Sequence, residues 1–328
     1  MAEACCAGER VIHLLATGGT IAMQRNAAAG GNVPALDASG LLDLIGDLGA
    51  GGEVRTEDWE RLPAVHRGPE RLWTLKSRVA ELLESPQPPE GIVITHGTDT
   101  LEETAYLLAR TLPPAVPVVL TGAMRTSSDA GWDGPRNLRD AVRVAGHPDS
   151  RGRGCLVVFA GRILDGRDAV KLDAFAPDAF RSLHSEQLGS IADETVRFAR
   201  PPESRRVLLP ARDLSARVAL LALVLGDDGG LLELARPGSA GVVLEAFGRG
   251  NCPPGIIPAV RRWLSEGKPV VLASRCPYGE VGGEYAFEGG GGHLLGLGVL
   301  AAGPRSASLA RLELALCLSA GVTYGAAA

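Results

Sequence analysis

The chain has 328 residues, of which 45% are hydrophobic and 22% are charged, and its formal net charge is −5. This composition excludes an intrinsically disordered chain, and the length predicts about two domains with sizeable cores. Nucleic acid is not an expected partner, because the arginines are scattered among acidic residues and form no basic stripe.

No membrane segment is expected, because the longest purely apolar run, residues 218–225, is far shorter than the roughly 18 residues of a spanning helix. Residues 1–10 contain no basic segment followed by an apolar one, so we expect no secretory signal and a cytoplasmic location. The cysteines have no spacing suited to zinc or to a redox motif, which predicts buried or incidental thiols: Cys5, Cys6, Cys155, Cys252, Cys276 and Cys317.

The first part of the chain alternates apolar runs with helical patterns. The apolar runs predict buried strands at residues 11–15, 92–94, 116–120 and 155–160. Helices are predicted from Asp37 or Ser39 to residue 48, and at residues 69–83, 100–110 and 137–144, with a strand and an irregular stretch within residues 53–66. Thr100 and Glu103 match a capping box. This alternation predicts one doubly wound α/β domain.

The pattern fails at residues 197–216, where prolines, arginines and serines predict a linker between a domain of residues 1–196 and one of residues 217–328. Strands are then predicted at residues 218–225, 241–244 and 270–272. Helices are predicted at residues 258–265 and 309–318, the last of them amphipathic. The second domain is therefore a smaller α/β domain.

Two glycine–threonine loops follow strands of the first domain. Thr17-Gly18-Gly19-Thr20 comes after the first strand, and His96-Gly97-Thr98-Asp99-Thr100 comes after the strand at residues 92–94. Ligands of open α/β sheets bind at the carboxyl ends of the strands, so Thr20, Thr98 and Asp99 are expected to share one crevice.

A threonine hydroxyl is a poor nucleophile and needs a neighbouring group that takes its proton. A lysine can serve, and a carboxylate can orient it. Of Lys76, Lys171 and Lys268, only Lys171 is expected in a loop after a strand of the first domain, beside Asp165 and Asp168.

Taken together, these motifs resemble the bacterial-type L-asparaginase family, and the resemblance covers nearly the whole chain. The blocks that carry it are residues 16–22, 96–105, 164–171, 122–125, 133–138 and 248–251. The resemblance implies that Thr20 attacks a side-chain amide, giving an acyl-enzyme and ammonia. It implies that Thr98, Asp99 and Lys171 handle protons, with Asp99 also facing the α-amino group of the substrate. No metal or organic cofactor is implied.

The resemblance also implies a fold, an assembly and further substrate contacts. The expected fold is a larger N-terminal doubly wound (flavodoxin-like) domain and a smaller C-terminal α/β domain. The expected assembly is a homo-oligomer, a dimer or a dimer of dimers, in which a neighbour's C-terminal domain completes each site. The residues expected to contact the substrate are Gly19, Ala64, Val65, Gly97, Ala123, Asn251 and Glu284.

Two of these assignments leave alternatives open. Asn251 is expected either at the site of the adjacent subunit or as a turn residue beside Gly250. The acidic residue near that site falls within residues 280–288, where Tyr285 and Glu288 compete with Glu284. The glycine run 289–292 predicts a flexible loop in which no helix starts, with His293 at the surface, whereas His96 is expected to hold its turn.

The sequence departs from the family near the substrate. No tyrosine occurs between Thr20 and Tyr106, and residues 23–34 predict a flexible loop that is either a lid or a plain surface loop. Ala64 and Val65 stand where the family presents a serine and a glutamine to the substrate's α-carboxylate. Each lost hydrogen bond to a charged group costs about 1.5–3 kcal/mol, unless His66 or Arg67 substitutes.

Three functions are therefore compared. The leading hypothesis is hydrolysis of L-asparagine, or of a close analogue, to L-aspartate and ammonia. The second is the same chemistry on a modified or peptide-linked asparagine or glutamine. The third is an amino-acid-binding homologue without turnover, against which the complete set of catalytic residue types argues.

Overall fold

The computed structural model describes residues 11–45, 53–203 and 207–325. The chain forms two compact units. The first comprises residues 1–182 and 186–206, and the second comprises residues 183–185 and 207–328.

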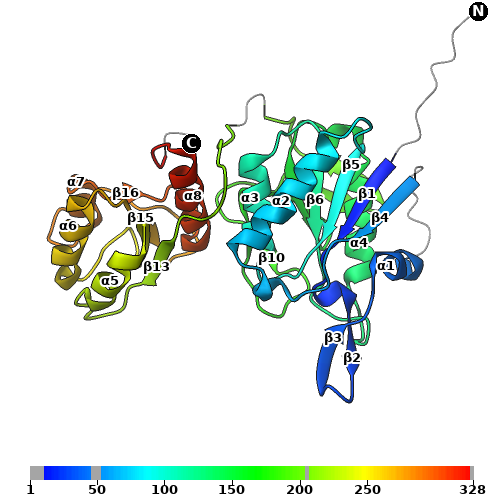
Figure 1. The fold of residues 1–328 in the computed structure, drawn as a ribbon, viewed down its shortest axis with the longest axis horizontal. Helices are drawn as coiled ribbons and strands as arrows, with labels where there is room; N and C mark the ends of the chain where they lie inside the picture. Colours follow the sequence, from blue (N-terminus) through cyan, green and yellow to red (C-terminus); the bar gives the residue numbers. More distant parts are fainter. Residues whose placement is uncertain (1–10, 46–52, 204–206, 326–328) are drawn as a thin grey trace, which may run out of the picture. The chain divides into compact units, whose positions relative to one another are not determined.

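The first unit is built on one mostly parallel sheet (Figure 1), whose strand order is β12-β11-β8-β7-β6-β5-β1-β4. Its strands are β1 (Val11–Ala16), β4 (Glu53–Asp58), β5 (Gly91–Thr95), β6 (Val118–Thr121), β7 (Cys155–Phe159), β8 (Arg162–Asp165), β11 (Gly189–Ala192) and β12 (Thr195–Phe198). From β4 to β7 the strands are parallel, in the 2-1-3-4-5 order of flavodoxin-like folds. The predicted fold class is thus confirmed. The antiparallel extension β8-β11-β12 was not predicted.

Helices cover both faces of this sheet (Figure 1), with α1 (Ala38–Ile45) and α4 (Gly134–Ala145) on one face and α2 (Pro69–Leu83) and α3 (Leu101–Thr111) on the other. Successive residues of a strand point to opposite faces. Accordingly, Val93 of β5 packs in the core beneath α4, whereas Ile92 and Ile94 pack beneath α2 and α3. All five residues of β5 are buried, which accounts for its continuous apolar run.

Two predicted helix starts have different outcomes. Asp37 caps α1, because its Oδ1 accepts a hydrogen bond of 2.8 Å from the backbone N–H of Gly40; the predicted end at residues 46–48 lies outside the described residues. Thr100 precedes α3, but its side chain makes no capping hydrogen bond, so the predicted capping box with Glu103 is wrong. The backbone of Thr100 (φ −130°, ψ 20°) lacks the extended ψ that usually directs a capping hydroxyl at the helix.

Residues 23–34 form a β-hairpin rather than the predicted flexible loop. Its strands are β2 (Met23–Asn26) and β3 (Gly31–Pro34), which pair in antiparallel register. The Oδ1 of Asn26 accepts a hydrogen bond from Ala29 in the turn. Ser128 accepts a hydrogen bond from the N–H of Arg25, which ties the hairpin to the loop after β6.

Shorter elements complete the first unit. They are the 3₁₀ turns η1 (Thr20–Ala22), η2 (Ala64–His66) and η3 (Pro148–Ser150), and the antiparallel pair β9 (Ala169–Lys171) and β10 (Phe180–Ser182). Lys171 is therefore the last residue of a short strand rather than a loop residue.

The second unit has a four-stranded parallel sheet, β13 (Val218–Ala222), β14 (Gly241–Ala246), β15 (Val270–Ser274) and β16 (Leu300–Ala301). Helix α8 (Ala307–Ala320) packs on one face, and α5 (Gly230–Ala235) and α6 (Ile257–Ser265) pack on the other (Figure 1). The turns η4 (Arg236–Gly238) and η5 (Pro254–Ile256) adjoin these two helices. The predicted amphipathic character of the last helix is wrong, because no residue of α8 is exposed.

A helix, α7 (Gly291–Gly296), begins inside the glycine run, so the prediction of a flexible loop without a helix start is wrong. The glycines are needed for close backbone packing. A Cβ at Gly290 would lie 2.4 Å from the carbonyl oxygen of Tyr285, and one at Gly291 would lie 2.4 Å from that of Gly282. His293 is half-buried, and its Nδ1 accepts a hydrogen bond from Gly289.

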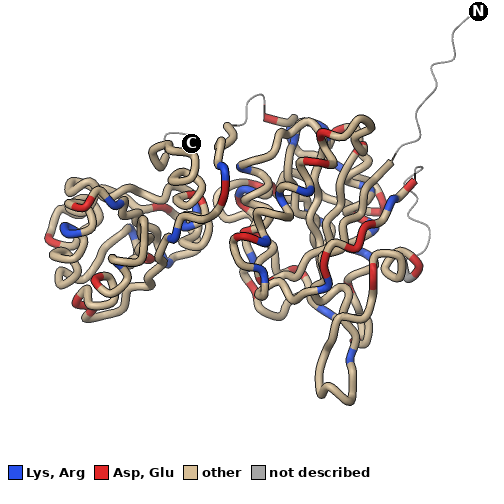
Figure 2. The backbone as a smooth tube through the Cα atoms, in the orientation of Figure 1, with Lys and Arg blue, Asp and Glu red and all other residues tan. Residues whose placement is uncertain are grey.

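Charged residues of both signs are interspersed in both units in the described ranges (Figure 2). Among the same residues, none of the helices is long and apolar enough to cross a membrane.

Candidate active site

The two glycine–threonine loops lie side by side at the carboxyl edge of the large sheet. They follow β1 and β5, which are neighbours and flank the point where the strand order reverses. Open α/β sheets bind ligands at this point. The loops are joined by Thr17, whose hydroxyl donates a hydrogen bond of 2.7 Å to the carbonyl oxygen of Thr95.

The backbones of these loops touch at Gly19 and Gly97. Gly19 has φ +86°, and a Cβ there would lie 2.4 Å from the nitrogen of Gly97. A Cβ at Gly97 would in turn lie 2.7 Å from that of Ala64. Only glycine fits both positions, so the sequence brings Thr20 and Thr98 near each other through residues that lack side chains.

The two threonines differ in exposure. Thr20 is half-buried and is the first residue of η1. Thr98 is buried, with 5% of its surface exposed. Thr98 is packed from a third loop as well, since a Cβ at Gly122 would lie 3.4 Å from its methyl group. Ala123, in the same loop, is fully buried.

Asp133 and Asn137 fix this third loop, a role that was not predicted from the sequence. The carboxylate of Asp133 accepts hydrogen bonds from the backbone N–H groups of Met124 and Arg125. The Nδ2 of Asn137 donates to the carbonyl oxygen of Gly122 at 3.0 Å. The signal was present in the sequence, because both residues stand at the start of a helix that directly follows the loop.

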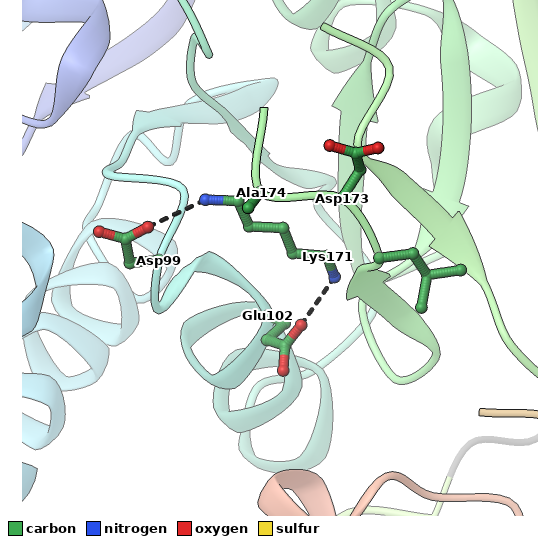
Figure 3. A pocket seen from close by; sticks show the side chains of 6 residues that line it. Asp99, Glu102, Lys171, Asp173 and Ala174 are labelled. Atoms are coloured by element: carbon green, nitrogen blue, oxygen red, sulfur yellow. Dashed lines mark hydrogen bonds and ion pairs between the residues drawn. The ribbon is translucent and has the colours of Figure 1, made fainter. Parts of the chain in front are cut away.

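Lys171 connects β9 to the second loop. Its Nζ donates a hydrogen bond of 2.9 Å to the Oγ1 of Thr98. It donates a second hydrogen bond, also of 2.9 Å, to the Oδ1 of Asp99 (Figure 3). The carboxylate that orients this lysine is therefore Asp99. Asp165, its neighbour in sequence, is buried and pairs instead with Arg167 at 2.8 Å.

Glu102 is a further residue of the site that was not predicted from the sequence. It lies in the first turn of α3, and its Oε2 accepts a hydrogen bond of 2.7 Å from the backbone N–H of Lys171 (Figure 3). The carboxylate thus fixes the main chain from which the lysine side chain extends.

An open cavity of about 410 Å³ adjoins this group (Figure 3). It is lined by Asp99, Glu102, Lys171, Leu172, Asp173 and Ala174. Three carboxylates and one ammonium group line the cavity, which favours a ligand that carries a positive charge.

His96 is fully buried behind the second loop. Its Nδ1 lies 2.8 Å from the carbonyl oxygen of Gly97, and its Nε2 lies 3.0 Å from the hydroxyl of Thr104. Burial, with a smaller contribution from the Arg67 charge, lowers the pKa of His96 to about 3. A neutral imidazole that holds the turn agrees with the expected structural role.

Residues 64–67 form the segment expected at the substrate's α-carboxylate, and its first two residues are apolar. Ala64 is buried beside Gly97, and Val65 is 62% exposed. Of the two residues named as possible substitutes, Arg67 is not available to a substrate carboxylate, because its side chain is only 2% exposed and is paired with Glu60 at 3.1 Å. His66 is exposed.

Comparisons with known proteins agree with this architecture. Residues 11–204 match the family model described as "Asparaginase, N-terminal", and residues 217–326 match the "Glutaminase/Asparaginase C-terminal domain". The chain belongs to the asparaginase family.

Related asparaginases match the chain over nearly its whole length. A "Probable L-asparaginase" of Deinococcus radiodurans is 36% identical over 319 residues, which cover 95% of this chain and 94% of the relative. An "L-asparaginase" of Bacillus licheniformis is 32% identical over 94% of this chain and 95% of the relative. The crystal structure of a "Probable Cytoplasmic L-asparaginase" from Campylobacter jejuni has a TM-score of 0.82 at 29% identity, over 94% of this chain and 95% of that one.

The remaining expected site residues of this asparaginase lie in its C-terminal unit. The Oδ1 of Asn251 accepts a hydrogen bond of 3.2 Å from the N–H of Gly291, and its backbone pairs with Phe247 in a tight turn. Glu284 forms an exposed ion pair with Arg249, which lowers the pKa of its carboxyl group. Both side chains are thus held locally.

Within the described ranges, no group of histidine, cysteine and acidic residues could hold a metal ion. Cys155, Cys252, Cys276 and Cys317 form no disulfide within the described ranges, whereas Cys5 and Cys6 lie outside them. Burial raises the pKa of the Cys252 thiol to about 12, so this thiol is not a nucleophile at neutral pH.

Proposed function

We propose that the protein hydrolyses the side-chain amide of L-asparagine to L-aspartate and ammonia, with Thr20 as the nucleophile. The observation that carries the proposal is the contact of the Lys171 Nζ with both Thr98 and Asp99, at 2.9 Å each. Similarity to proteins named L-asparaginase over nearly the whole chain supports this substrate.

In the first step, the Thr20 oxygen attacks the amide carbon while its proton passes to the Thr98 oxygen. Lys171 must first release one proton to solvent; its amine form then takes the proton of Thr98, and Asp99 stabilises the resulting ammonium group. The amide nitrogen leaves as ammonia after taking up one proton, and the acyl group stays on Thr20. Water then cleaves this ester along the same proton route, releasing the acid and restoring the threonine.

The loops supply the other contacts that this reaction needs. Gly19, Gly97 and Ala123 are proposed to contact the substrate through their backbones, where N–H groups would stabilise the oxyanion. Asp99, whose side chain is 65% exposed, would receive the substrate's α-ammonium group beside the acidic cavity.

The site is proposed to be shared between subunits of a homo-oligomer, a dimer or a dimer of dimers. Asn251 and Glu284 would reach the adjacent subunit's site. The domain boundaries at residues 196 and 217 are proposed on the sequence pattern, and the family matches end and begin near them. A cytoplasmic location is proposed, and the Campylobacter jejuni neighbour is described as a probable cytoplasmic L-asparaginase.

A modified or peptide-linked asparagine or glutamine is the second candidate substrate. It is favoured because Ala64 and Val65 are apolar and Arg67 is buried. Of the described residues 64–67, expected at the substrate's α-carboxylate, only His66 then has a polar and exposed side chain. A substrate without a free carboxylate would lose nothing there.

Ammonia release from a panel of amides tests both candidates. The panel contains L-asparagine, L-glutamine, and asparagine whose α-carboxylate is amidated or peptide-linked. Cleavage of L-asparagine with the highest kcat/KM supports the first candidate, and faster cleavage of the amidated compound supports the second. Tight binding in calorimetry without ammonia release from any amide would contradict both and would indicate a non-catalytic homologue.

A further inference from the structure

Arg67 is a buried guanidinium that reaches both catalytic loops. It follows η2, and its side chain is 2% exposed. One of its terminal nitrogens, Nη2, donates to the carbonyl oxygen of Thr17, at the start of the loop that ends in Thr20. The other, Nη1, lies 3.3 Å from the Nε2 of His96, which directly precedes Gly97 and Thr98.

We propose that Arg67 is a positioning residue that fixes the Thr17–Thr20 loop against the His96–Asp99 loop, through hydrogen bonds to the Thr17 carbonyl and the His96 ring. The proposal rests on the amidase function proposed above. It does not make Arg67 a catalytic residue, because its guanidinium is paired with protein groups and does not line the cavity beside Lys171.

The chemistry of the His96 ring supports a real hydrogen bond at this point. Its Nδ1 faces a carbonyl oxygen, which can only accept, so Nδ1 carries the ring proton. The Nε2 lone pair is then an acceptor for Arg67, while the Thr104 hydroxyl, 3.0 Å from Nε2, can donate its single proton to the Thr100 carbonyl oxygen at 3.1 Å. A neutral imidazole in this tautomer is favoured beside Arg67, because a protonated ring would repel the guanidinium charge.

The charge of Arg67 is balanced by Glu60. The Nε of Arg67 donates to the Oε2 of Glu60 at 3.1 Å, and the side chain of Glu60 is itself only 18% exposed. Burial lowers the pKa of Arg67 and the Glu60 carboxylate opposes this, but an arginine remains protonated in either case. The guanidinium thus keeps all its directed donors at neutral pH.

The planar fork of arginine is what allows three contacts in different directions. Glu60, Thr17 and His96 are each met by a different nitrogen. A lysine carries a charge but no fixed fork, so it cannot hold all three partners in one geometry. The two loops already touch at Gly19 and Gly97, so a shift of either loop changes the separation of Thr20 and Thr98.

Arg71 supplies a matched control. It pairs with the same Glu60, at 2.6 Å, but its side chain is 55% exposed, and the structure gives it no contact with either loop in the described ranges. Replacing Arg67 and Arg71 each by methionine in the full chain therefore removes one partner of Glu60 in both cases. Only Arg67→Met also removes the connection between the loops.

The test compares kcat and KM for ammonia release in the wild type, Arg67→Met, Arg67→Lys and Arg71→Met. Misplacement of reacting groups by about 1 Å costs about 10²-fold in rate. We expect Arg67→Met to lower kcat by about tenfold to a hundredfold with little change in KM, Arg67→Lys to lower it less, and Arg71→Met to match the wild type. Thermal unfolding of each variant shows whether it is folded at the assay temperature.

Three results would overturn the proposal. The first is a folded Arg67→Met or Arg67→Lys enzyme with wild-type kcat. The second is a loss of kcat in Arg71→Met equal to that in Arg67→Met. The third is a rise in the KM of Arg67→Met without a change in kcat, which would indicate direct substrate contact. If Arg67→Met does not fold, Arg67→Lys decides. A wild type that cleaves no amide refutes the proposed function itself, whereas an active wild type with an equally active Arg67→Met refutes only the positioning role.

Discussion

Replacing Lys171 by methionine separates catalysis from stability. The Lys171–Asp99 ion pair has side-chain exposures of 17% and 65%, and such pairs contribute about 0–1 kcal/mol to stability. The hydrogen bond to Thr98 adds about 0.5–1.5 kcal/mol. The variant should therefore lose at most about 2.5 kcal/mol of unfolding free energy, which lowers the Tm of a domain of this size by less than about 10 °C.

Its effect on the reaction should be much larger. Proton transfer by a positioned side chain contributes about 10²–10⁴-fold, or about 2.7–5.4 kcal/mol of activation free energy. Ammonia release by Lys171→Met should therefore fall by at least about a hundredfold at a temperature where the variant is folded.

Lys268→Met is the matched control. Lys268 also has an ion pair, with Glu266, and donates a hydrogen bond to the Arg236 carbonyl, but it lies in the C-terminal unit. Its kcat should equal that of the wild type. A folded Lys171→Met enzyme with more than a tenth of the wild-type rate would refute the proton-handling role of Lys171.

Three further predictions concern the scaffold of the site. Gly19→Ala should lower the free energy of unfolding, measured in urea, by about 1–3 kcal/mol or more through strain and a backbone clash with Gly97. Gly30→Ala, also at positive φ but with open space around it, should cost less. His96 is neutral in the folded state with a pKa of about 3, and the unfolded chain takes up its proton near pH 6.5. The contribution of His96 to the free energy of unfolding should therefore be fully present above about pH 6.5 and be lost as the pH drops toward 3. In His96→Gln, the free energy of unfolding should depend less steeply on pH between about 6.5 and 4.5. Asn137→Leu leaves the carbonyl of the loop after β6 and the N–H of Ala160 without their partners, and chemical denaturation should show a loss of about 1–3 kcal/mol per group.

The parallel core of the first unit could be predicted from the sequence because its strands are buried on both faces. A short, continuous apolar run such as that of β5 is typical of a strand that helices cover on either side. The extension β8-β11-β12 lacked this signal, since β12 alternates between exposed and half-buried residues. The hairpin β2-β3 was missed for the same reason, because its strands contain mostly polar and partly exposed residues.

The site was predictable only in part. The order of Thr20, Thr98, Asp99 and Lys171 along the chain indicated which residues to consider. The partner of Lys171 depends on a contact across 72 positions, which residue spacing does not encode, and Asp165 was nearer in sequence. Arg67 is a comparable case, because only the folded chain turns its guanidinium inward, away from the position where a substrate carboxylate was expected.

The most direct test of the proposed function is ammonia release from L-asparagine by the wild type, Thr20→Ser and Thr20→Ala. Threonine and serine both supply a hydroxyl group, so the wild type and Thr20→Ser should turn over, and folded Thr20→Ala should lose activity by several orders of magnitude. Ammonia release by Thr20→Ala at the wild-type rate would contradict the central role of Thr20.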